Sequence, residues 1–271
     1  MMKIKIPFLF LFGALAFAAP YSYAEEAPAR TACTSSCCSV MMQDYRTFEM
    51  RTYYAADGKL DALHERFRNH TIKLFEKHGM TNLGYWVPQE NPENKLIYVL
   101  AFPSREARDN SFGNFVNDPE WQEAYEASHA DGVLVDRIES VFLKATDYSP
   151  IIFPSWKKDG NRTFELRTYT AHEGKLEDLH ERFRNHTTAL FARHGITNIG
   201  YWTPTEADDG SENTLVYVVA HKSRDGAAES FDAFRNDPEW QAVYEASRVD
   251  GPLVEGIESV FMNPVDYSSI R

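Results

Sequence analysis

The chain repeats itself, and this repeat limits its fold more than any other feature of the sequence. Shifted by 116 positions, Arg46 to Pro88 aligns with Arg162 to Pro204, and about 30 of the 43 paired residues are identical. After three extra residues near Glu206 to Asn213, the match resumes at a shift of 119, where Asp-Pro-Glu-Trp-Gln occurs at 118–122 and again at 237–241. Agreement of this extent does not arise by chance, so the chain carries two copies of one domain.

The copies divide the chain into domains at 46–149 and 162–268, joined by a linker at 150–161. The linker carries Pro and Gly and breaks both helical and strand periodicity. Its apolar side chains are expected to pack against the domains, so the linker should not act as a free tether; they are Ile151, Ile152, Phe153 and Trp156.

The first 24 residues have the pattern of a secretion signal. Lys3 and Lys5 precede an apolar run from Ile6 to Ala19 that is too short to cross a membrane as a helix. Small residues before Glu25 favour cleavage after Ala24, and a retained membrane anchor is the alternative. The sequence therefore predicts an exported protein, secreted or periplasmic.

All three cysteines fall in the tail at 25–45, as Cys33, Cys37 and Cys38. Neither repeated domain can therefore contain a disulfide or a thiolate nucleophile. Within the tail three interpretations stay open: one small disulfide loop with an odd thiol, a soft-metal site with the nearby Met41 and Met42, or incidental cysteines in a flexible segment.

The net charge of -12 bears on the partners that the protein could have. Nucleic acids and anionic membrane surfaces attract clustered Lys and Arg, so both are disfavoured. The sequence has no further transmembrane candidate after the signal. Small molecules or other proteins are the expected partners.

Hydrophobic periodicity predicts the same elements in each copy. Alternation at 48–54 indicates a strand, apolar residues at helical spacing indicate a helix from Lys59 to His78 that stops at Gly79, and aromatic runs at 83–87 and 96–102 indicate a hairpin. A helix at 104–116, a second one that follows the Asp118 cap and reaches Ser128, and a strand at 138–143 complete the copy. The order βαββαβ predicts an α+β, ferredoxin-like domain with helices on one face of an antiparallel sheet.

The hairpin strands carry large apolar residues on both faces, so the face without helices cannot remain in water. The simplest cover is the same face of the other copy. We therefore expect the two copies to pack sheet to sheet as one intrachain barrel, which predicts a monomeric pseudo-dimer and leaves a higher oligomer open.

Several short motifs carry a family likeness. They are Phe-Glu-Leu-Arg-Thr-Tyr at 164–169, Gly-Lys-Leu at 174–176, His194-Gly195, Gly-Tyr-Trp at 200–202 and Asp-Pro-Glu-Trp at 237–240, with a matching series in the first copy. This set resembles the NIPSNAP family over nearly all of the chain beyond the tail and linker. The resemblance implies a dimeric α/β-barrel fold. The wider barrel superfamily includes cofactor-free monooxygenases, haem enzymes and isomerases, but no motif here is diagnostic of one of them.

Charged residues alternate with apolar ones on the first strand of each copy. Glu49, Arg51 and Tyr53 share one strand face, and the second copy repeats the set as Glu165, Arg167 and Tyr169. One face of this strand must line the barrel, and the sequence leaves open which one. Buried charges must be paired, so either Glu and Arg form a structural pair, or the arginines await an anionic ligand framed by the tyrosines.

Histidines add a second group of candidates on the first helix. His70 and His186 lie near its apolar stripe, where a satisfied, partly buried histidine competes with a metal or haem ligand. The six-residue spacing from His64 to His70 disfavours a zinc pair, and no metal site is expected. His172 and His221 have no counterpart in the first copy and mark the half that could have specialised.

Two functions follow from these features. The first is an exported binding or interaction module that holds a small organic molecule or contacts a protein, with ligand residues Glu49, Arg51, Tyr53, His70, Glu165, Arg167, Tyr169 and His186. The second is an oxygenase, independent of cofactors or dependent on haem, that acts on a hydrophobic or aromatic small molecule. No cofactor is expected, with haem as the open alternative, because no phosphate-binding loop is present.

Overall fold

The computed structural model of the protein describes residues 43–153 and 162–271. The expected signal, the three cysteines and Trp156 lie outside these residues. No helix in the described ranges is both long and apolar enough to cross a membrane.

The first half confirms the predicted order of elements. They are β1 (Thr47–Ala55), α1 (Leu60–Arg66), η1 (Phe67–Thr71), α2 (Ile72–Lys77), β2 (Thr81–Pro88), β3 (Lys95–Phe102), α3 (Arg105–Val116), α4 (Pro119–Ser128) and β4 (Val135–Ala145). The strands extend beyond the predicted ranges because their hydrogen-bonded pairing continues past the apolar residues that signalled them.

The second half repeats the order. It contains β5 (Thr163–Ala171), α5 (Leu176–Arg182), η2 (Phe183–Thr187), α6 (Thr188–Arg193), β6 (Thr197–Pro204), β7 (Thr214–His221), α7 (Arg224–Arg235), α8 (Pro238–Ala246) and β8 (Val254–Pro264). The three extra residues of this copy fall in the loop around a short 3₁₀ turn, η3 (Ala207–Asp209).

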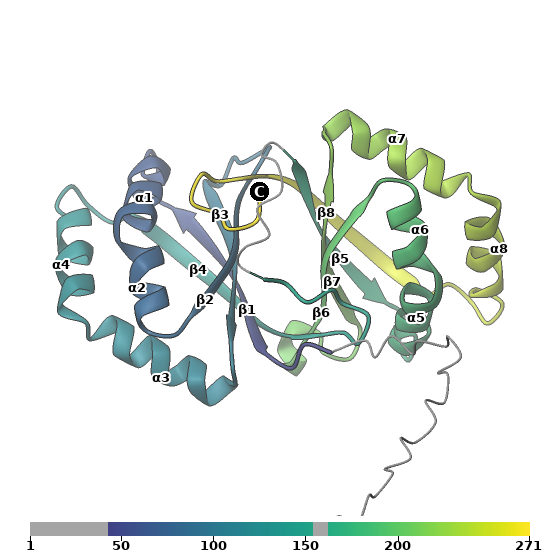
Figure 1. Ribbon diagram of the computed structural model, residues 1–271, viewed down its shortest axis with the longest axis horizontal. Helices are drawn as coiled ribbons and strands as arrows, with labels where there is room; N and C mark the ends of the chain where they lie inside the picture. Colours follow the sequence, from purple (N-terminus) through teal and green to yellow (C-terminus); the bar gives the residue numbers. More distant parts are fainter. Residues whose placement is uncertain (1–42, 154–161) are drawn as a thin grey trace, which may run out of the picture. The chain divides into compact units, whose positions relative to one another are not determined.

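The eight strands close into one barrel with the order β1-β3-β2-β8-β5-β7-β6-β4. Each half supplies four antiparallel strands, and the halves join through two short pairings, β2 with β8 and β4 with β6. Figure 1 shows the helices on the outer side of each half, with the strands between them. The sheet-to-sheet arrangement expected from the sequence is confirmed.

The apolar face of each first strand lines the barrel. Phe48, Phe164 and Leu166 belong to a buried cluster that joins both halves, and Met50 packs against it. Glu49 and Arg51, with their counterparts Glu165 and Arg167, therefore point away from the barrel interior and toward the helices, since successive strand residues face opposite sides. The structure thus answers the question of strand face that the sequence left open.

The first helix of each half is interrupted, although the periodicity predicted one continuous helix. A π-helical turn separates α1 from α2 and α5 from α6. The Thr71 hydroxyl donates to the Arg66 carbonyl at 3.3 Å, and the Thr187 hydroxyl donates to the Arg182 carbonyl at 3.2 Å. These bonds satisfy backbone oxygens at the bulge, a type of irregularity that often accompanies functional sites.

The segment after the last strand of each half crosses to the other half. Tyr267 lies 2.8 Å from Nδ1 of His64, and Asp266 accepts from Arg68 at 2.6 Å. The first half reaches across in the same way, where Tyr148 contacts His180 and Asp147 accepts from Arg184. These crossed contacts tie the halves together beyond the two short strand pairings.

The linker packs only in part. Ile152 is buried in the barrel core, and Ile151 is half-buried. The expectation for Phe153 is wrong, because this side chain is 56% exposed.

The capping prediction for the last helices is confirmed. The carboxylates of Asp118 and Asp237 accept the backbone N–H of Glu120 and Glu239 at 2.9 and 2.8 Å. The same two carboxylates lie 2.6 and 2.7 Å from Nε2 of His78 and His194. These histidines, at the ends of α2 and α6, thus have an acidic partner.

Candidate functional site

Glu49 sits at the centre of a closed polar cluster between the sheet and α3. It pairs with Arg51 and receives two further bonds from Arg108, at 2.7 and 2.9 Å. Ser140 donates to it at 2.6 Å. Arg108 donates to both oxygens of the buried Glu49 carboxylate, as in a bidentate ion pair. We therefore interpret this cluster as a structural ion pair of the first half.

Glu165 occupies the same place in the second half with a different set of partners. Arg167 and the Ser259 hydroxyl each donate at 2.5 Å, and Nε2 of His221 lies 3.0 Å away. No arginine approaches from the helix here, because Ala227 stands where the first half has Arg108. His221, which has no histidine counterpart in the first copy, therefore contacts Glu165 in the way that Arg108 contacts Glu49.

Both carboxylates remain anionic in these clusters. Burial alone would raise the pKa of Glu49, but hydrogen bonds from Arg108 and Ser140 and the charge of Arg51 bring it below the ordinary value. The pKa of Glu165 is also lowered, because His221, Arg167 and Ser259 outweigh the effect of burial.

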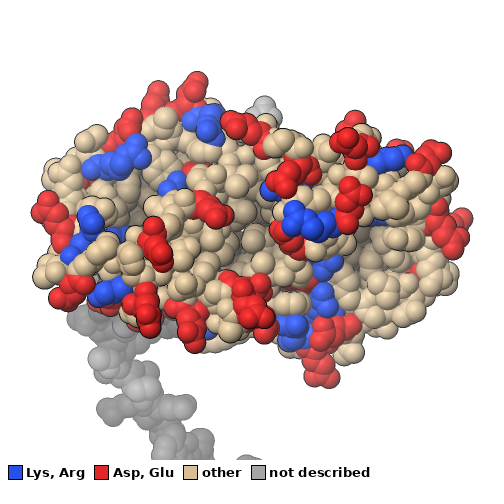
Figure 2. All heavy atoms as spheres, turned by 180° about the vertical axis from the view of Figure 1, so that it is seen from behind, with Lys and Arg blue, Asp and Glu red and all other residues tan. Residues whose placement is uncertain are grey.

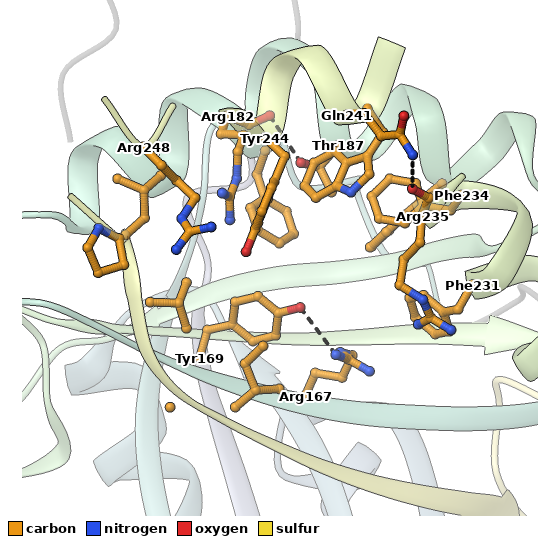
Figure 3. A pocket seen from close by; sticks show the side chains of 18 of the residues that line it. Arg167, Tyr169, Arg182, Thr187, Phe231, Phe234, Arg235, Gln241, Tyr244 and Arg248 are labelled. Atoms are coloured by element: carbon orange, nitrogen blue, oxygen red, sulfur yellow. Dashed lines mark hydrogen bonds between the residues drawn. The ribbon is translucent and has the colours of Figure 1, made fainter. Parts of the chain in front are cut away.

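A pocket of about 750 Å³ lies beside this cluster in the second half. Its floor is formed by Arg167 and Tyr169 on β5 and by residues 254–257 of β8, and its roof is formed by α5 to α8. Figure 3 shows Arg182 pointing down from the helix layer toward Tyr169 on the strand. The volume suits an organic molecule of moderate size.

The walls of the pocket are mostly aromatic. Side chains from η2, α6, α7 and α8 supply the rings, namely Phe183, Phe191, Phe231, Phe234, Trp240 and Tyr244. Such rings favour a flat or apolar ligand body.

Arg182 is the unusual residue of the pocket. It is only 7% exposed, and its Nε finds no hydrogen-bond partner within the described part of the chain. Its Nη1 donates to the Ser247 hydroxyl at 3.2 Å. In the ranges 43–153 and 162–271, no carboxylate lies within 4.0 Å of its guanidinium.

Burial lowers the pKa of Arg182 below its usual value, which shows that the surroundings disfavour its charge. Two aromatic rings partly offset this, since the guanidinium carbon lies 5.4 Å from the Trp240 centroid and 5.8 Å from the Tyr244 centroid. A buried guanidinium without an acid is costly, and an anion in the pocket would remove that cost.

Arg167 also has fewer hydrogen-bond partners than Arg51, its counterpart in the first half. Nε of Arg51 donates to the Tyr98 hydroxyl at 3.0 Å. Arg167 instead donates through Nη2 to Tyr169 at 3.2 Å, and its Nε has no partner among the described residues. The hydroxyl of Tyr217, the counterpart of Tyr98, is likewise buried and unpartnered within those residues. The second half thus leaves more polar groups unsatisfied beside its pocket.

The structure separates the eight predicted ligand residues into different environments. Arg167 and Tyr169 line the pocket, while Glu165 lies behind Arg167 as its counter-ion. His186 is half-buried on η2 and is not among the residues that line the pocket. In the first half, Glu49, Arg51 and Tyr53 form the equivalent strand cluster, and His70 lies on η1.

The most informative residue was missed from the sequence. Arg182 follows Leu179 by three positions and precedes Phe183, so it occupies the buried stripe of its helix. A charged residue at such a position is the signal that could have identified it. Arg248, at the pocket mouth, was missed because it lies in a loop.

The lining offers little to haem iron. Proteins bind that iron through His, Cys, Met or Tyr, and among the lining residues only Tyr169 and Tyr244 belong to this group. Both rings lie beside guanidinium groups, within 5.5 Å of Arg167 and 4.7 Å of Arg248 respectively. Among the lining residues, haem iron would thus find only two tyrosine oxygens as ligands, each beside a guanidinium.

The arginines at the pocket contrast with the rest of the surface. On the face shown in Figure 2, acidic groups are spread over both halves, and basic groups lie between them. In a chain of net charge -12, four arginines and one acidic residue, Glu255, line this pocket, and two of the arginines, Arg167 and Arg235, are paired with Glu165 and Asp232.

Comparison with known proteins agrees with the geometry. The NIPSNAP family model matches residues 48–150 and 164–269. The "Protein NipSnap homolog" of Dictyostelium discoideum is 24% identical over 197 residues, which is 72% of this chain and 78% of that protein.

Two solved structures share the whole barrel. The "putative monooxygenase" of Lactobacillus acidophilus NCFM superposes with a TM-score of 0.53 at 13% identity, over 82% of this chain and 94% of its own. The "putative monooxygenase" of Fusobacterium nucleatum gives 0.52 at 12% identity, over 83% and 94%. At such identities the likeness shows the fold alone.

Proposed function

The chain belongs to the NIPSNAP family, and from this premise we propose that it is a binding module for a small organic acid with an aromatic or hydrophobic body. The site is the pocket between the sheet and the helices of the second half. The acid group pairs with Arg182, and the body packs against the aromatic walls.

One observation carries the proposal: Arg182 is buried at a pocket of about 750 Å³ and lacks an acid partner among the described residues. Arg66, the counterpart in the first half, is also buried, bonds a serine and has an Nε without a partner among the described residues. What Arg182 has in addition is the pocket beside it, together with Arg248, which is His129 in the first half. A protein partner explains the observation less well, because the side chain of a partner would have to enter beneath α8 to reach Arg182.

The sequence supports a site of action outside the cytoplasm. Residues 1–24 have the pattern of a secretion signal, so the proposed module works as a secreted or periplasmic protein. The binding reaction needs no cofactor. N-terminal sequencing of the protein from its native host would test the export step through a start at Glu25.

Mass spectrometry of small molecules released from the purified protein is the direct test of the binding function. We expect an organic acid to be released from the wild-type protein and from Arg66→Met, which changes the equivalent residue of the first half. Arg182→Met should release at least tenfold less, because a charge-assisted hydrogen bond contributes about 1.5–3 kcal/mol.

Thermal unfolding distinguishes this role from a structural one. Methionine has a similar length and no charge, so Arg182→Met without ligand should melt at or above the wild-type temperature. A large loss of stability in the ligand-free variant would instead assign Arg182 to the fold. Release of only neutral molecules, or equal release from both proteins, would rule out the proposed acid site.

A further inference from the structure

The pocket holds a second arginine that its acid-binding role does not require. Arg182 and Arg248 lie beside one ring, with guanidinium carbons 5.8 and 4.7 Å from the Tyr244 centroid. Throughout the described residues, Arg248 has no carboxylate within 4.0 Å. The other two arginines of the pocket are different because they pair with acids, Arg167 with Glu165 and Arg235 with Asp232.

Two like charges near one ring repel each other, and among the described residues no carboxylate lies within 4.0 Å of either group, although Glu255 also lines the pocket. The charge of Arg248 is one of the influences that lower the pKa of Arg182. Figure 3 shows the side chains of Arg182, from α5, and Arg248, from the turn after α8, extending into the same part of the pocket, next to Tyr244. Arg248 is exposed, so water screens much of this repulsion, but an anion placed between the two guanidinium groups would be attracted by both.

The first half shows that the fold does not need the second arginine. His129 replaces Arg248 there, stacks on Tyr125 with ring centroids 4.0 Å apart, and its Nδ1 lies 2.7 Å from the Tyr125 carbonyl. Arg66 nevertheless keeps its place and its bond to Ser128. The second guanidinium is therefore an addition specific to the half with the pocket.

We infer that the ligand of this pocket carries a doubly negative head group with the chemistry of a phosphate monoester, held by Arg182 and Arg248 together. The inference rests on the proposed acid-binding function and names the acid. A phosphate monoester brings nearly two charges and three acceptor oxygens at neutral pH, whereas a monocarboxylate brings one charge and two oxygens. Of these two groups, only the phosphate monoester carries enough negative charge to balance the positive charges of both guanidinium groups.

Calorimetric titration of the full chain with four probes tests the inference. The probes are benzyl alcohol, benzoate, phenyl phosphate and inorganic phosphate, at pH 8 where the phosphate groups carry two charges. Phenyl phosphate should bind at least tenfold more tightly than benzoate, and benzyl alcohol should bind most weakly.

Two matched variants exchange the residue that differs between the halves. Arg248→His should reduce the preference for phenyl phosphate over benzoate to about threefold or less, with little change for benzoate. His129→Arg, the reverse exchange in the first half, should leave the affinity for both probes unchanged.

Each remaining outcome has a distinct meaning. Equal affinity for benzoate and phenyl phosphate would overturn the dianionic head group and leave the acid-binding function standing. If no anionic probe binds and the purified protein releases no acid, both proposals fall. If inorganic phosphate binds as tightly as phenyl phosphate, the head group is upheld and the aromatic body of the proposed ligand is wrong.

Discussion

Gly84→Ala and Gly200→Ala should each destabilise the protein by about 1–3 kcal/mol or more, the usual cost of overfilling a packed core. A Cβ at Gly84 would meet the indole of Trp86 at 2.1 Å, and one at Gly200 would meet the indole of Trp202 at 2.3 Å. Both indoles are almost fully buried in the barrel and have little room to move. Urea unfolding of the two variants measures the loss.

A glycine in an open position provides the control. No heavy atom lies within 4 Å of a Cβ built on Gly113 in α3, and alanine favours a helix by up to about 1 kcal/mol over glycine. Gly113→Ala should therefore leave stability unchanged or raise it. Adding Trp86→Phe to Gly84→Ala should recover part of the loss, because the smaller ring frees space. Wild-type stability for Gly84→Ala alone would contradict the packing argument.

This contact gives a physical meaning to one motif of the family resemblance. In Gly-Tyr-Trp, the first and third residues share a strand face, so the indole folds back over the glycine inside the barrel. The tyrosine between them, Tyr85 or Tyr201, points to the helix side and belongs to the core of its own half. The motif thus places one aromatic residue in the barrel and one under the helices.

The fold could be predicted from the sequence because independent signals agreed. Strand alternation, helix stops at Gly79 and Gly195, the Asp caps and the repeat all indicate two βαββαβ copies. The π turns could not be predicted, because Phe67 and Leu74 lie seven residues apart, the spacing of an uninterrupted α-helix, so the apolar pattern gives no sign of an extra residue. The exposed Phe153 was missed because an apolar residue in a linker gives no information about its direction.

The site was harder to predict because the first strand is buried on both sides. Its apolar face lines the barrel and its charged face lies under the helices, so polarity alone does not identify the inner face. The expected Glu–Arg pairs are present in both halves, but they belong to separate clusters. The pocket depends on Arg182 and Arg248, which are far apart in sequence from Arg167 and share no short motif with it.

The buried glutamates have different partners in the two halves, Arg108 at Glu49 and His221 at Glu165, and the second large prediction concerns this difference. His221→Phe introduces the residue that the first half has at this position, Phe102, but not its arginine. Glu165 would then keep Arg167 and Ser259 and lose the bond from His221. Removing a hydrogen bond to a charged group should destabilise the protein by about 1.5–3 kcal/mol at pH 7.

The sign of the pH dependence follows from the lowered pKa of Glu165. Burial opposes ionisation, but His221 and the other partners bring the folded pKa below the value of 4.5 expected for the unfolded chain. The carboxylate therefore stabilises the fold above that pH, and its contribution disappears as the pH falls through the folded pKa. The difference between wild type and His221→Phe should be largest at neutral pH and shrink below about pH 4.5.

A second substitution should restore the lost stability by copying the first half completely. Ala227 stands where Arg108 lies, and an arginine there would find Phe231 and Phe261 in the places of Phe112 and Phe142, the rings beside Arg108. His221→Phe combined with Ala227→Arg should therefore recover most of the loss, whereas Ala227→Arg alone would place a large side chain against His221 and destabilise the fold. Urea midpoints for the three variants at pH 7 decide the matter. If the double variant is no more stable than the sum of the single changes predicts, the two halves do not use interchangeable partners for their buried glutamates.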